Sequence, residues 1–254
     1  MKKVKLDKVA GFLDKYFDVK NFPDYGGARN GLQFENSGGV CKVAAAVDAG
    51  LAEIEQAAEM GADLLIVHHG LFWNAPIPFV GSNYRKVKAL IDSDMAVYSV
   101  HLPLDAHPQI GNNALIAKAL SLDTLGRCFS HEGRDIAVLA SPPSGGRAEL
   151  QRRLKKLFPD TFKAIAFGPD KPKKIAICSG SCGEAVPQLN EFGIDTLICG
   201  ELRQQHYVMA QEMQLNLYPC GHWATERFGI DALGGVLAKK FALKYSFIPS
   251  ANPL

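Results

Sequence analysis

The sequence predicts an α/β protein made of two pseudo-repeated α/β units, each with a mainly parallel sheet and flanking helices. An internal repeat is the first observation behind this prediction: residues 42–70 align without a gap with residues 174–202. Both stretches run from a basic residue through an apolar strand, a helical middle and a Gly-x-Asp turn into a second apolar strand. The second observation is that these strands are continuous apolar runs, which is typical of buried parallel strands. Strands that alternate with helices complete the pattern of a parallel sheet covered by helices.

In the first unit, residues 1–125, helical and strand-like segments alternate. Residues 4–18 predict an amphipathic helix, because their apolar side chains recur at helical spacing. Residues 22–37 are rich in turn formers and predict an irregular loop. The other predicted elements are strands at 43–47, 64–67 and 96–100 and helices at 51–60, 84–92 and 112–120.

The second unit, residues 126–254, begins with a middle region that predicts two strands and a helix. The second copy of the repeat follows a basic connector. The closing tail is predicted to start as a short strand and to end frayed, because its prolines prevent regular continuation. The predicted strands are 135–140, 162–167, 174–178, 195–199 and 215–219, and the predicted helices are 147–158, 184–192, 203–213 and 225–240.

Composition gives no reason to expect nucleic acid or a membrane as a partner. The chain has 254 residues, 47% of them hydrophobic, and a net charge of +2, with no long run of Lys or Arg. Nothing therefore demands nucleic acid or an anionic membrane as a partner. No apolar run reaches the length of a bilayer span, and the N-terminal residues do not resemble a signal peptide. The six cysteines form no C-x-x-C pair, so we expect reduced, buried thiols in a cytoplasmic protein.

Two adjacent histidines end an apolar strand of the first repeat. His68 and His69 follow the strand 64–67 and precede Gly70. Binding groups gather just past the carboxyl ends of strands in open α/β sheets. Neighbouring residues of a strand point to opposite faces. The pair therefore predicts ligands for two ions side by side, or one ligand and one hydrogen-bonding group.

A histidine and a carboxylate four residues apart follow a strand in each half: His101 with Asp105, and His222 with Glu226. This spacing places two side chains on one face of a helix. The helical interpretation is natural for the second pair, whereas Pro103 disfavours it for the first unless it lies in the first turn.

Imidazoles and carboxylates without thiolates suit zinc, iron(II) or manganese better than a structural four-cysteine zinc site. Any one of these histidines could be an ordinary core or surface residue. The three clusters together, the histidine pair and the two His-x-x-x-carboxylate pairs, predict a metal site because all follow matched strands. Two divalent ions could share a bridging carboxylate such as Glu226 and activate a water molecule. His107, His131 and His206 have no carboxylate at ligand spacing. Of these, His107 is predicted to support the ligands or contact substrate.

Three further segments have two interpretations each. Residues 179–184 resemble a weak phosphate-binding loop, yet they lack the P-loop pattern and are also explained as a tight turn. Residues 30–33, Asn-Gly-Leu-Gln, form either a ligand-facing loop or a plain turn. Trp73 either lines a pocket or packs inside the protein. Cys182 has little support as a nucleophile.

These motifs together resemble one known family. The segments at 30–33, 67–73, 101–114 and 221–230 are similar, in order, to those of the NIF-three-like family. Its members are often labelled GTP cyclohydrolase 1 type 2 homologs or dinuclear metal centre hexameric proteins. The resemblance covers nearly the whole chain and matches the short bacterial form. It implies a toroidal homohexamer with a two-metal site facing a central cavity.

The resemblance also implies ligand roles. His69 and Asp105 would bind one ion, His68 and His222 the other, and Glu226 would bridge the two. His101 matches a histidine at the family's site, and its role as a direct ligand stays open. Many relatives have Thr-Asn where this chain has Leu102 and Pro103, which leaves the ligands intact and alters the polarity beside them.

Two functions follow from this set. The first is a metal-dependent hydrolase that acts on a purine nucleotide, such as GTP, with His101 or His107 moving protons. The second is a non-catalytic metal-binding ring that binds a partner or nucleic acid, although near-neutral charge disfavours the latter. The two copies of the repeat differ at their strand ends, where Gly200 and Glu201 replace the histidine pair. We therefore expect one asymmetric site at the junction of the two units, with two divalent ions per chain.

Overall fold

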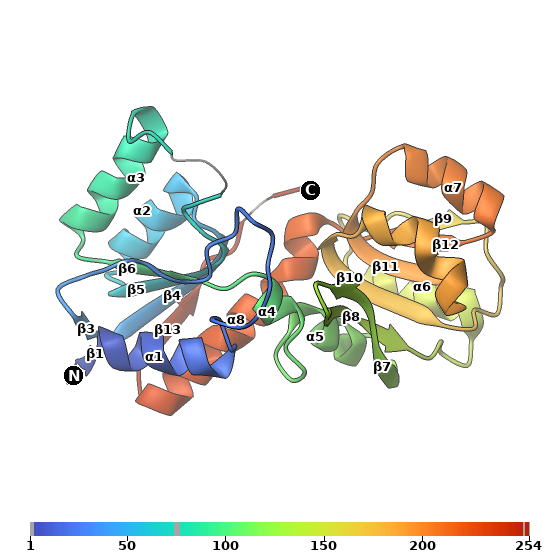
Figure 1. The fold of residues 1–254 in the computed structure, drawn as a ribbon, viewed down its shortest axis with the longest axis horizontal. Helices are drawn as coiled ribbons and strands as arrows, with labels where there is room; N and C mark the ends of the chain where they lie inside the picture. Colours follow the sequence, from blue (N-terminus) through green and yellow to red (C-terminus); the bar gives the residue numbers. More distant parts are fainter. Residues whose placement is uncertain (1–2, 74–76, 251, 254) are drawn as a thin grey trace. The chain divides into compact units, whose positions relative to one another are not determined.

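The structure is a computed structural model that describes residues 3–73, 77–250 and 252–253. It is an α/β fold with two main sheets (Figure 1), which confirms the predicted fold class. The chain divides into two compact units. Unit 1 comprises the residues up to Leu104 together with Gly229–Ser250, and unit 2 comprises Asp105–Phe228 and the last residues. The chain passes from one unit to the other inside two helices rather than at a linker.

Unit 1 contains a five-stranded sheet in the order β13-β4-β5-β6-β2, in which only the β6–β2 pair is antiparallel. Strands β1 and β3 form a separate, two-stranded antiparallel sheet. The strands are β1 (Val4–Lys5), β2 (Gly31–Phe34), β3 (Gly39–Val40), β4 (Lys42–Asp48), β5 (Leu64–His69), β6 (Ala96–Ser99) and β13 (Lys244–Phe247). The helices are α1 (Leu6–Tyr16), α2 (Leu51–Glu59), α3 (Gly81–Asp92), α4 (Leu102–Asp105) and α8 (His222–Phe241), of which α4 and α8 extend into unit 2.

The first sheet is buried on both faces, which explains its unbroken apolar strands. On one face, side chains of β4 and β5 pack with α2 and α3, through residues such as Leu65, Ile54 and Leu90. Figure 1 shows α1 and the later part of α8 on the opposite face. Burying the apolar sides of these helices stabilises the unit by about 25 cal/mol for each Å² removed from water.

Unit 2 contains a six-stranded sheet in the order β7-β8-β10-β11-β12-β9. Strands β10, β11 and β12 pair in parallel, and the other three pairings are antiparallel, so this sheet is mixed rather than mainly parallel as predicted. The strands are β7 (Thr124–His131), β8 (Arg134–Ala140), β9 (Ile165–Ala166), β10 (Ile175–Ser181), β11 (Thr196–Glu201) and β12 (Asn216–Pro219). The helices are α5 (Asn112–Ala119), α6 (Gly146–Leu157), the 3-10 helix η1 (Gly183–Phe192) and α7 (Gln205–Met213).

The core of unit 2 has two layers, one on each face of its sheet. Helices α5 and α6 pack on the face that includes Ile177 and Ile198. Helices η1 and α7 pack on the face that includes Cys178 and Cys199. All six cysteines are free thiols, and five of them are buried. The thiols therefore serve as small apolar core residues.

The internal repeat is visible in strand register. Val43 of β4 pairs with Leu64 of β5, and Ile175 of β10 pairs with Thr196 of β11, so each pairing joins the same positions of the repeat. The turn before the second strand also matches, because Gly61 and Gly193 have φ angles of +67° and +66°. A side chain is strained at such angles, which explains glycine in both copies.

Four strands, β1, β2, β3 and β7, lie where the sequence predicted none. β2 lies inside the predicted irregular loop and pairs antiparallel with β6. β7 forms a hairpin with β8 through Glu132 and Gly133, both with positive φ. Such two-residue turns match the twist of a hairpin. No helix among the described residues is both long enough and apolar enough to span a membrane.

Candidate metal centre

Three histidines of unit 1 form a tight group, here called the imidazole cluster: His68, His69 and His101. The first two end β5, and His101 follows β6, the parallel neighbour of β5. The ring centroid of His68 lies 4.9 Å from those of both His69 and His101, and the remaining pair is 5.7 Å apart. One nitrogen of each ring lies within 4.8 Å of the other two. The strand ends thus bring three imidazole rings together.

The adjacent histidines do not diverge as the strand periodicity predicts. His69 is the last residue of β5, where the pleat ends, and its ring lies beside that of His68. The pair can therefore contribute to one ion as well as to two.

Each ring of the imidazole cluster makes the same kind of contact through Nδ1. The partner of His68 is the Val100 carbonyl oxygen at 3.0 Å. The partners of His69 and His101 are the carboxylates of Asp48 and Asp24, each at 2.8 Å. Carbonyl and carboxylate oxygens accept hydrogen bonds, so Nδ1 donates in all three pairs. This geometry assigns the proton of each neutral ring to Nδ1 and the lone pair to Nε2.

This pattern fits a metal ion. Histidines that bind metals almost always donate their other ring nitrogen to a carboxylate or carbonyl, which fixes the ring and its tautomer. His68 is fully buried and His101 nearly so, which suits a site shielded from water. Imidazole nitrogen is a ligand for zinc, iron and copper alike, so the donors define a class of ion rather than one element.

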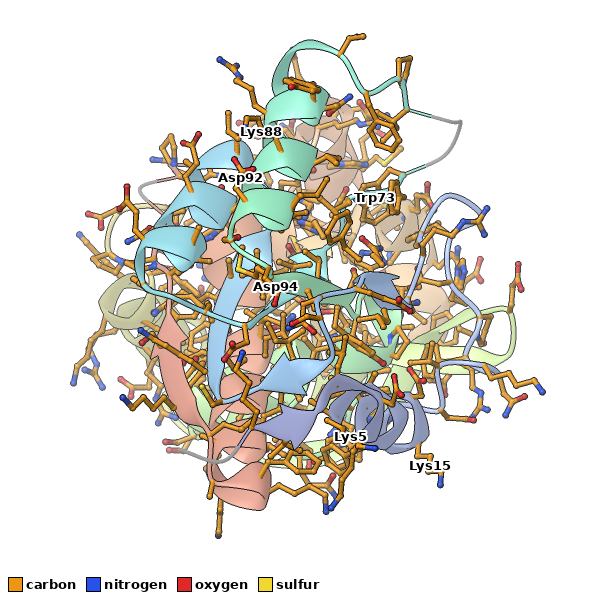
Figure 2. All side chains as sticks on the ribbon, turned by 90° about the vertical axis from the view of Figure 1, so that its left-hand side faces the viewer. Lys5, Lys15, Trp73, Lys88, Asp92 and Asp94 are labelled. Carbon is orange, nitrogen blue, oxygen red and sulfur yellow. The ribbon has the colours of Figure 1, made fainter. Side chains whose placement is uncertain are left out.

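The Asn-Gly-Leu-Gln segment supports the two loops that carry these histidines. Asn30 Oδ1 accepts a hydrogen bond from the His101 N–H at 2.7 Å. Gln33 Oε1 accepts one from the Leu71 N–H at 2.6 Å. A Cβ at Gly70 would lie 2.3 Å from Gln33 Nε2, so a larger residue directly after the histidine pair would displace the Gln33 amide. Trp73 (Figure 2) packs at right angles to the His101 ring, with centroids 5.1 Å apart. The segment is therefore not a plain turn, because residues 31–34 form β2 and Asn30 and Gln33 hold the two loops.

In unit 2, Asp105 is buried and held in one orientation. Its Oδ1 accepts hydrogen bonds from Asn112 Nδ2 and from Ser179 Oγ, both at 2.8 Å. Asn113 Oδ1 accepts the Ser179 N–H at 2.6 Å, which completes the buried network. Asp105 ends the short helix α4, and Pro103 lies in its first turn, where the missing N–H is tolerated.

His222 and Glu226 lie one turn apart at the start of α8. His222 Nε2 is 3.1 Å from Glu226 Oε1, and its Nδ1 is 3.3 Å from Glu201 Oε1. Glu226 is only 3% exposed. Burial lowers the pKa of His222, but the Glu226 and Glu201 carboxylates outweigh burial and raise this pKa to about 9. Glu201 occupies the position in the second copy that His69 occupies in the first. The first copy thus has a histidine at this position, whereas the second has a carboxylate that contacts His222.

Gly180 makes room for this pair. It follows Ser179 at the end of β10 and has a φ of +64°. A Cβ at this position would lie 2.2 Å from Glu226 Oε1 and 3.2 Å from His222 Nε2. The corresponding residue of the first copy is Asp48, which contacts His69. The weak resemblance of residues 179–184 to a phosphate loop is therefore explained by packing against the carboxylate.

Two other histidines, His107 and His206, accept hydrogen bonds from nearby backbone N–H groups. His107 Nδ1 accepts the N–H groups of Gln109 and Ile110, each at 3.3 Å. Burial lowers the pKa of His107, with a smaller contribution from Arg127. His206 Nδ1 accepts the Arg203 N–H at 2.9 Å, at the start of α7. Through these hydrogen bonds, His107 and His206 each stabilise the local backbone turn.

Sequence reasoning missed Asp24 and Asp48. Asp48 ends β4, next to β5, so the rule that polar residues past parallel strands share one edge could have found it. Asp24 lies in a segment without regular structure, 77 residues before its partner His101. No periodic signal connects the two.

Comparisons with known proteins agree with these motifs. Residues 4–253 match the family Duf34/NIF3 (NGG1p interacting factor 3). A protein of Yersinia pestis, named GTP cyclohydrolase 1 type 2 homolog, is 37% identical over 258 residues and all of both chains. One of the same name from Deinococcus radiodurans is 35% identical over 243 residues, covering 95% of this chain and 92% of that protein.

Solved structures agree with the fold. Protein ybgI, described as of unknown function, is 32% identical and superposes with a TM-score of 0.89, covering 99% of this chain and all of that one. TTHA1606 from Thermus thermophilus is 33% identical, with a TM-score of 0.88 and the same coverage. The resemblance seen in the sequence is confirmed: this chain belongs to the Duf34/NIF3 family.

Proposed function

We propose that the protein binds two divalent metal ions through His68, His69, Asp105, His222 and Glu226. The roles are those that the family resemblance implies, with Glu226 as the bridging carboxylate. One observation carries the proposal: the rings of His68 and His69 donate Nδ1 to an oxygen, which leaves Nε2 as the ligand atom. The hydrogen bonds to Asp105 Oδ1 orient that carboxylate in the same way.

The same ligand set supports a hydrolase. Bound divalent ions lower the pKa of water and polarise the group that is attacked. The residues of this chain would hold the ligands in place and accept a proton. Of the two histidines predicted to move protons, His101 has the better placement, because it belongs to the imidazole cluster and donates Nδ1 to Asp24.

We propose a purine nucleotide as the substrate class, with ring-opening of GTP as the reaction. The support is the name shared by relatives that are 32–37% identical over nearly the whole chain, GTP cyclohydrolase 1 type 2 homolog. The alternative is a metal-binding ring without catalysis, and the experiment below separates the two.

The experiment compares metal-loaded and metal-free protein, purified without a His tag, on a panel of nucleotides that includes GTP. His69→Ala and Glu226→Ala should lose bound metal and activity together. Asp92→Asn, on the outer side of α3 (Figure 2), should keep both, because its partner is the exposed Lys88. Turnover that is unchanged in metal-free protein would refute the hydrolase. Full metal binding without turnover of any nucleotide would favour the non-catalytic ring.

We also propose that the chain assembles as a toroidal homohexamer in the cytoplasm, as its family resemblance implies. Native mass spectrometry tests the assembly directly. Six copies are the expected result, and a stable monomer at micromolar concentration would contradict the proposal.

A further inference from the structure

Asp24 is a buried carboxylate in a segment that has no regular secondary structure. It lies between α1 and β2, where residues 17–30 form turns and extended chain. Its side chain is nevertheless only 6% exposed. Burying a charged group in a loop is costly unless it is fully hydrogen-bonded, so such a residue calls for a specific reason.

Four donors converge on this carboxylate. Oδ1 accepts the Tyr25 N–H at 2.7 Å and His101 Nδ1 at 2.8 Å. Oδ2 accepts Asn30 Nδ2 at 2.7 Å and the Leu102 N–H at 3.1 Å. Asn30 Oδ1 also accepts the His101 N–H. The loop therefore binds the backbone of His101 through Asn30 and its ring through Asp24.

Only an ionised carboxylate satisfies this arrangement. An asparagine in place of Asp24 would turn its NH₂ group toward two of the four donors, whichever way the amide lies. Burial raises the pKa of Asp24, but the bonds from His101, Asn30 and the Tyr25 N–H hold this pKa below its usual value. The carboxylate is therefore charged at neutral pH, and it faces the Nδ1 proton of His101.

The three rings of the imidazole cluster differ in how strongly Nδ1 is held. His68 donates to a neutral carbonyl. The carboxylate partner of His69, Asp48, is 41% exposed, so water screens the attraction. The carboxylate partner of His101 is buried, so its field acts with little screening. Of the three, His101 has the Nδ1 partner that is both a carboxylate and buried, so its Nδ1 proton is held most firmly.

We propose that Asp24 is a positioning residue that fixes the proton of His101 on Nδ1 and thereby makes Nε2 of His101 the proton acceptor of the site. The proton taken up at Nε2 comes from water or substrate, and Asp24 stabilises the imidazolium that forms without being protonated itself. Orienting carboxylates act in this way in serine hydrolases, where replacement by asparagine installs the wrong tautomer. The acceptor role rests on the proposed hydrolase, whereas the tautomer is a property of the folded chain alone.

The test reads the tautomer directly. Metal-free, full-length protein with ¹⁵N-labelled histidine is measured by long-range ¹H–¹⁵N NMR at a pH where imidazoles are neutral, and His101→Gln assigns the signals. We expect His101 to carry its proton on Nδ1 in the wild type and mainly on Nε2 in Asp24→Asn. A wild-type His101 protonated on Nε2 overturns the proposal without any variant, as does an unchanged tautomer in Asp24→Asn.

A matched variant distinguishes the effect of the Asp24 carboxylate on the His101 tautomer from the effect of an ordered loop. Asn30→Ala removes one donor to Asp24 and one backbone contact of His101 but leaves the carboxylate, so the Nδ1 proton should stay. If Asn30→Ala changes the tautomer as much as Asp24→Asn does, loop order rather than the carboxylate positions the ring, and the proposal fails.

A second readout concerns the reaction. With metal content unchanged, Asp24→Asn should lower kcat for GTP by about 10²–10⁴-fold, the usual contribution of a positioned acid–base group. A loss confined to KM would contradict proton transfer through His101. If wild-type protein turns over no nucleotide, the hydrolase is refuted, and the tautomer measurement still decides the role of Asp24.

Discussion

At the scale of single residues, the candidate centre depends on side chains that touch its histidines rather than on the histidines alone. Asp48 shows this for His69, whose Nδ1 lies 2.8 Å from its carboxylate. We predict that Asp48→Ala lowers zinc affinity by about 10–100-fold, the usual cost of losing such a partner. Competition titration against a chelating dye measures this, with Asp92→Ala as a surface control. Equal affinities for Asp48→Ala and wild type would contradict the orienting role.

Gly180 gives a second prediction at this scale. Gly180→Ala places a Cβ in a left-handed position and against Glu226. The backbone strain should cost about 1–2 kcal/mol, and displacement of Glu226 should weaken metal binding as well. Gly193→Ala is the matched control, because its φ is similar and its nearest neighbour is the Lys174 Nζ at 3.9 Å. Thermal unfolding and metal titration should show both losses for Gly180→Ala and only the stability loss for the control.

The sequence predicted the histidines and carboxylates of the site because each follows an apolar strand. It could not predict Asp24, because a contact 77 residues away leaves no local pattern. Nor could it predict that Asn112 and Ser179 would hold Asp105, since those bonds depend on how α5 and β10 pack.

At the scale of elements, the aspartate of the Gly-x-Asp turn, just before each second strand, binds the backbone at the start of the first strand. Asp63 Oδ2 accepts the N–H groups of Cys41 and Lys42 at 2.8 and 2.9 Å, which fixes the start of β4. Asp195 Oδ2 accepts the Lys173 N–H at 2.8 Å in the second copy. The repeated aspartate is therefore a structural residue that links two parallel strands.

This link predicts a pH dependence of stability. Burial raises the pKa of Asp63, but hydrogen bonds from Cys41, Lys3 and Lys42 outweigh burial and lower it. A lowered folded-state pKa contributes stability above the unfolded value of about 3.9, and this is lost as pH falls through the folded value. Asp63→Asn should lower the free energy of unfolding at neutral pH by about 1–3 kcal/mol. It should also reduce the acid-side slope in urea titrations, and an unchanged slope would contradict the assignment.

The helices and parallel strands were predictable because their signals are local: helical spacing for α1 and unbroken apolar runs for β4, β5 and β10. Strands β2 and β7 were missed for a physical reason. β2 is short and half-buried, and β7 is largely exposed, so neither has a strong apolar pattern. Both depend on antiparallel partners, β6 and β8, for their hydrogen bonds.

At the scale of the whole molecule, the duplication produces two sheets, but different strands flank the repeated strands in each sheet. Strand β13, from the end of the chain, pairs with β4, whereas β8 takes the equivalent place beside β10. A local pattern cannot show such a long-range pairing, so the compact units do not follow the halves 1–125 and 126–254. The unequal copies also explain why His68 and His69 have no counterparts at Gly200 and Glu201.

Metal binding should stabilise the whole chain. Ions that bind the folded state alone add stability by mass action, about 2.7 kcal/mol at a concentration one hundred times Kd. We therefore expect Tm to fall on chelation and to recover when zinc or manganese is restored. Glu226→Gln should show a much smaller response, and an equal response would place the metal elsewhere.

The central claim is that these histidines and carboxylates form a dinuclear metal centre. Elemental analysis of protein purified without a His tag and reconstituted with zinc, iron(II) or manganese tests it most directly. We predict about two divalent ions per chain, the content of a two-metal site, with a marked loss in His69→Ala. Well under one ion per chain after reconstitution, or unchanged content in His69→Ala, would contradict the account.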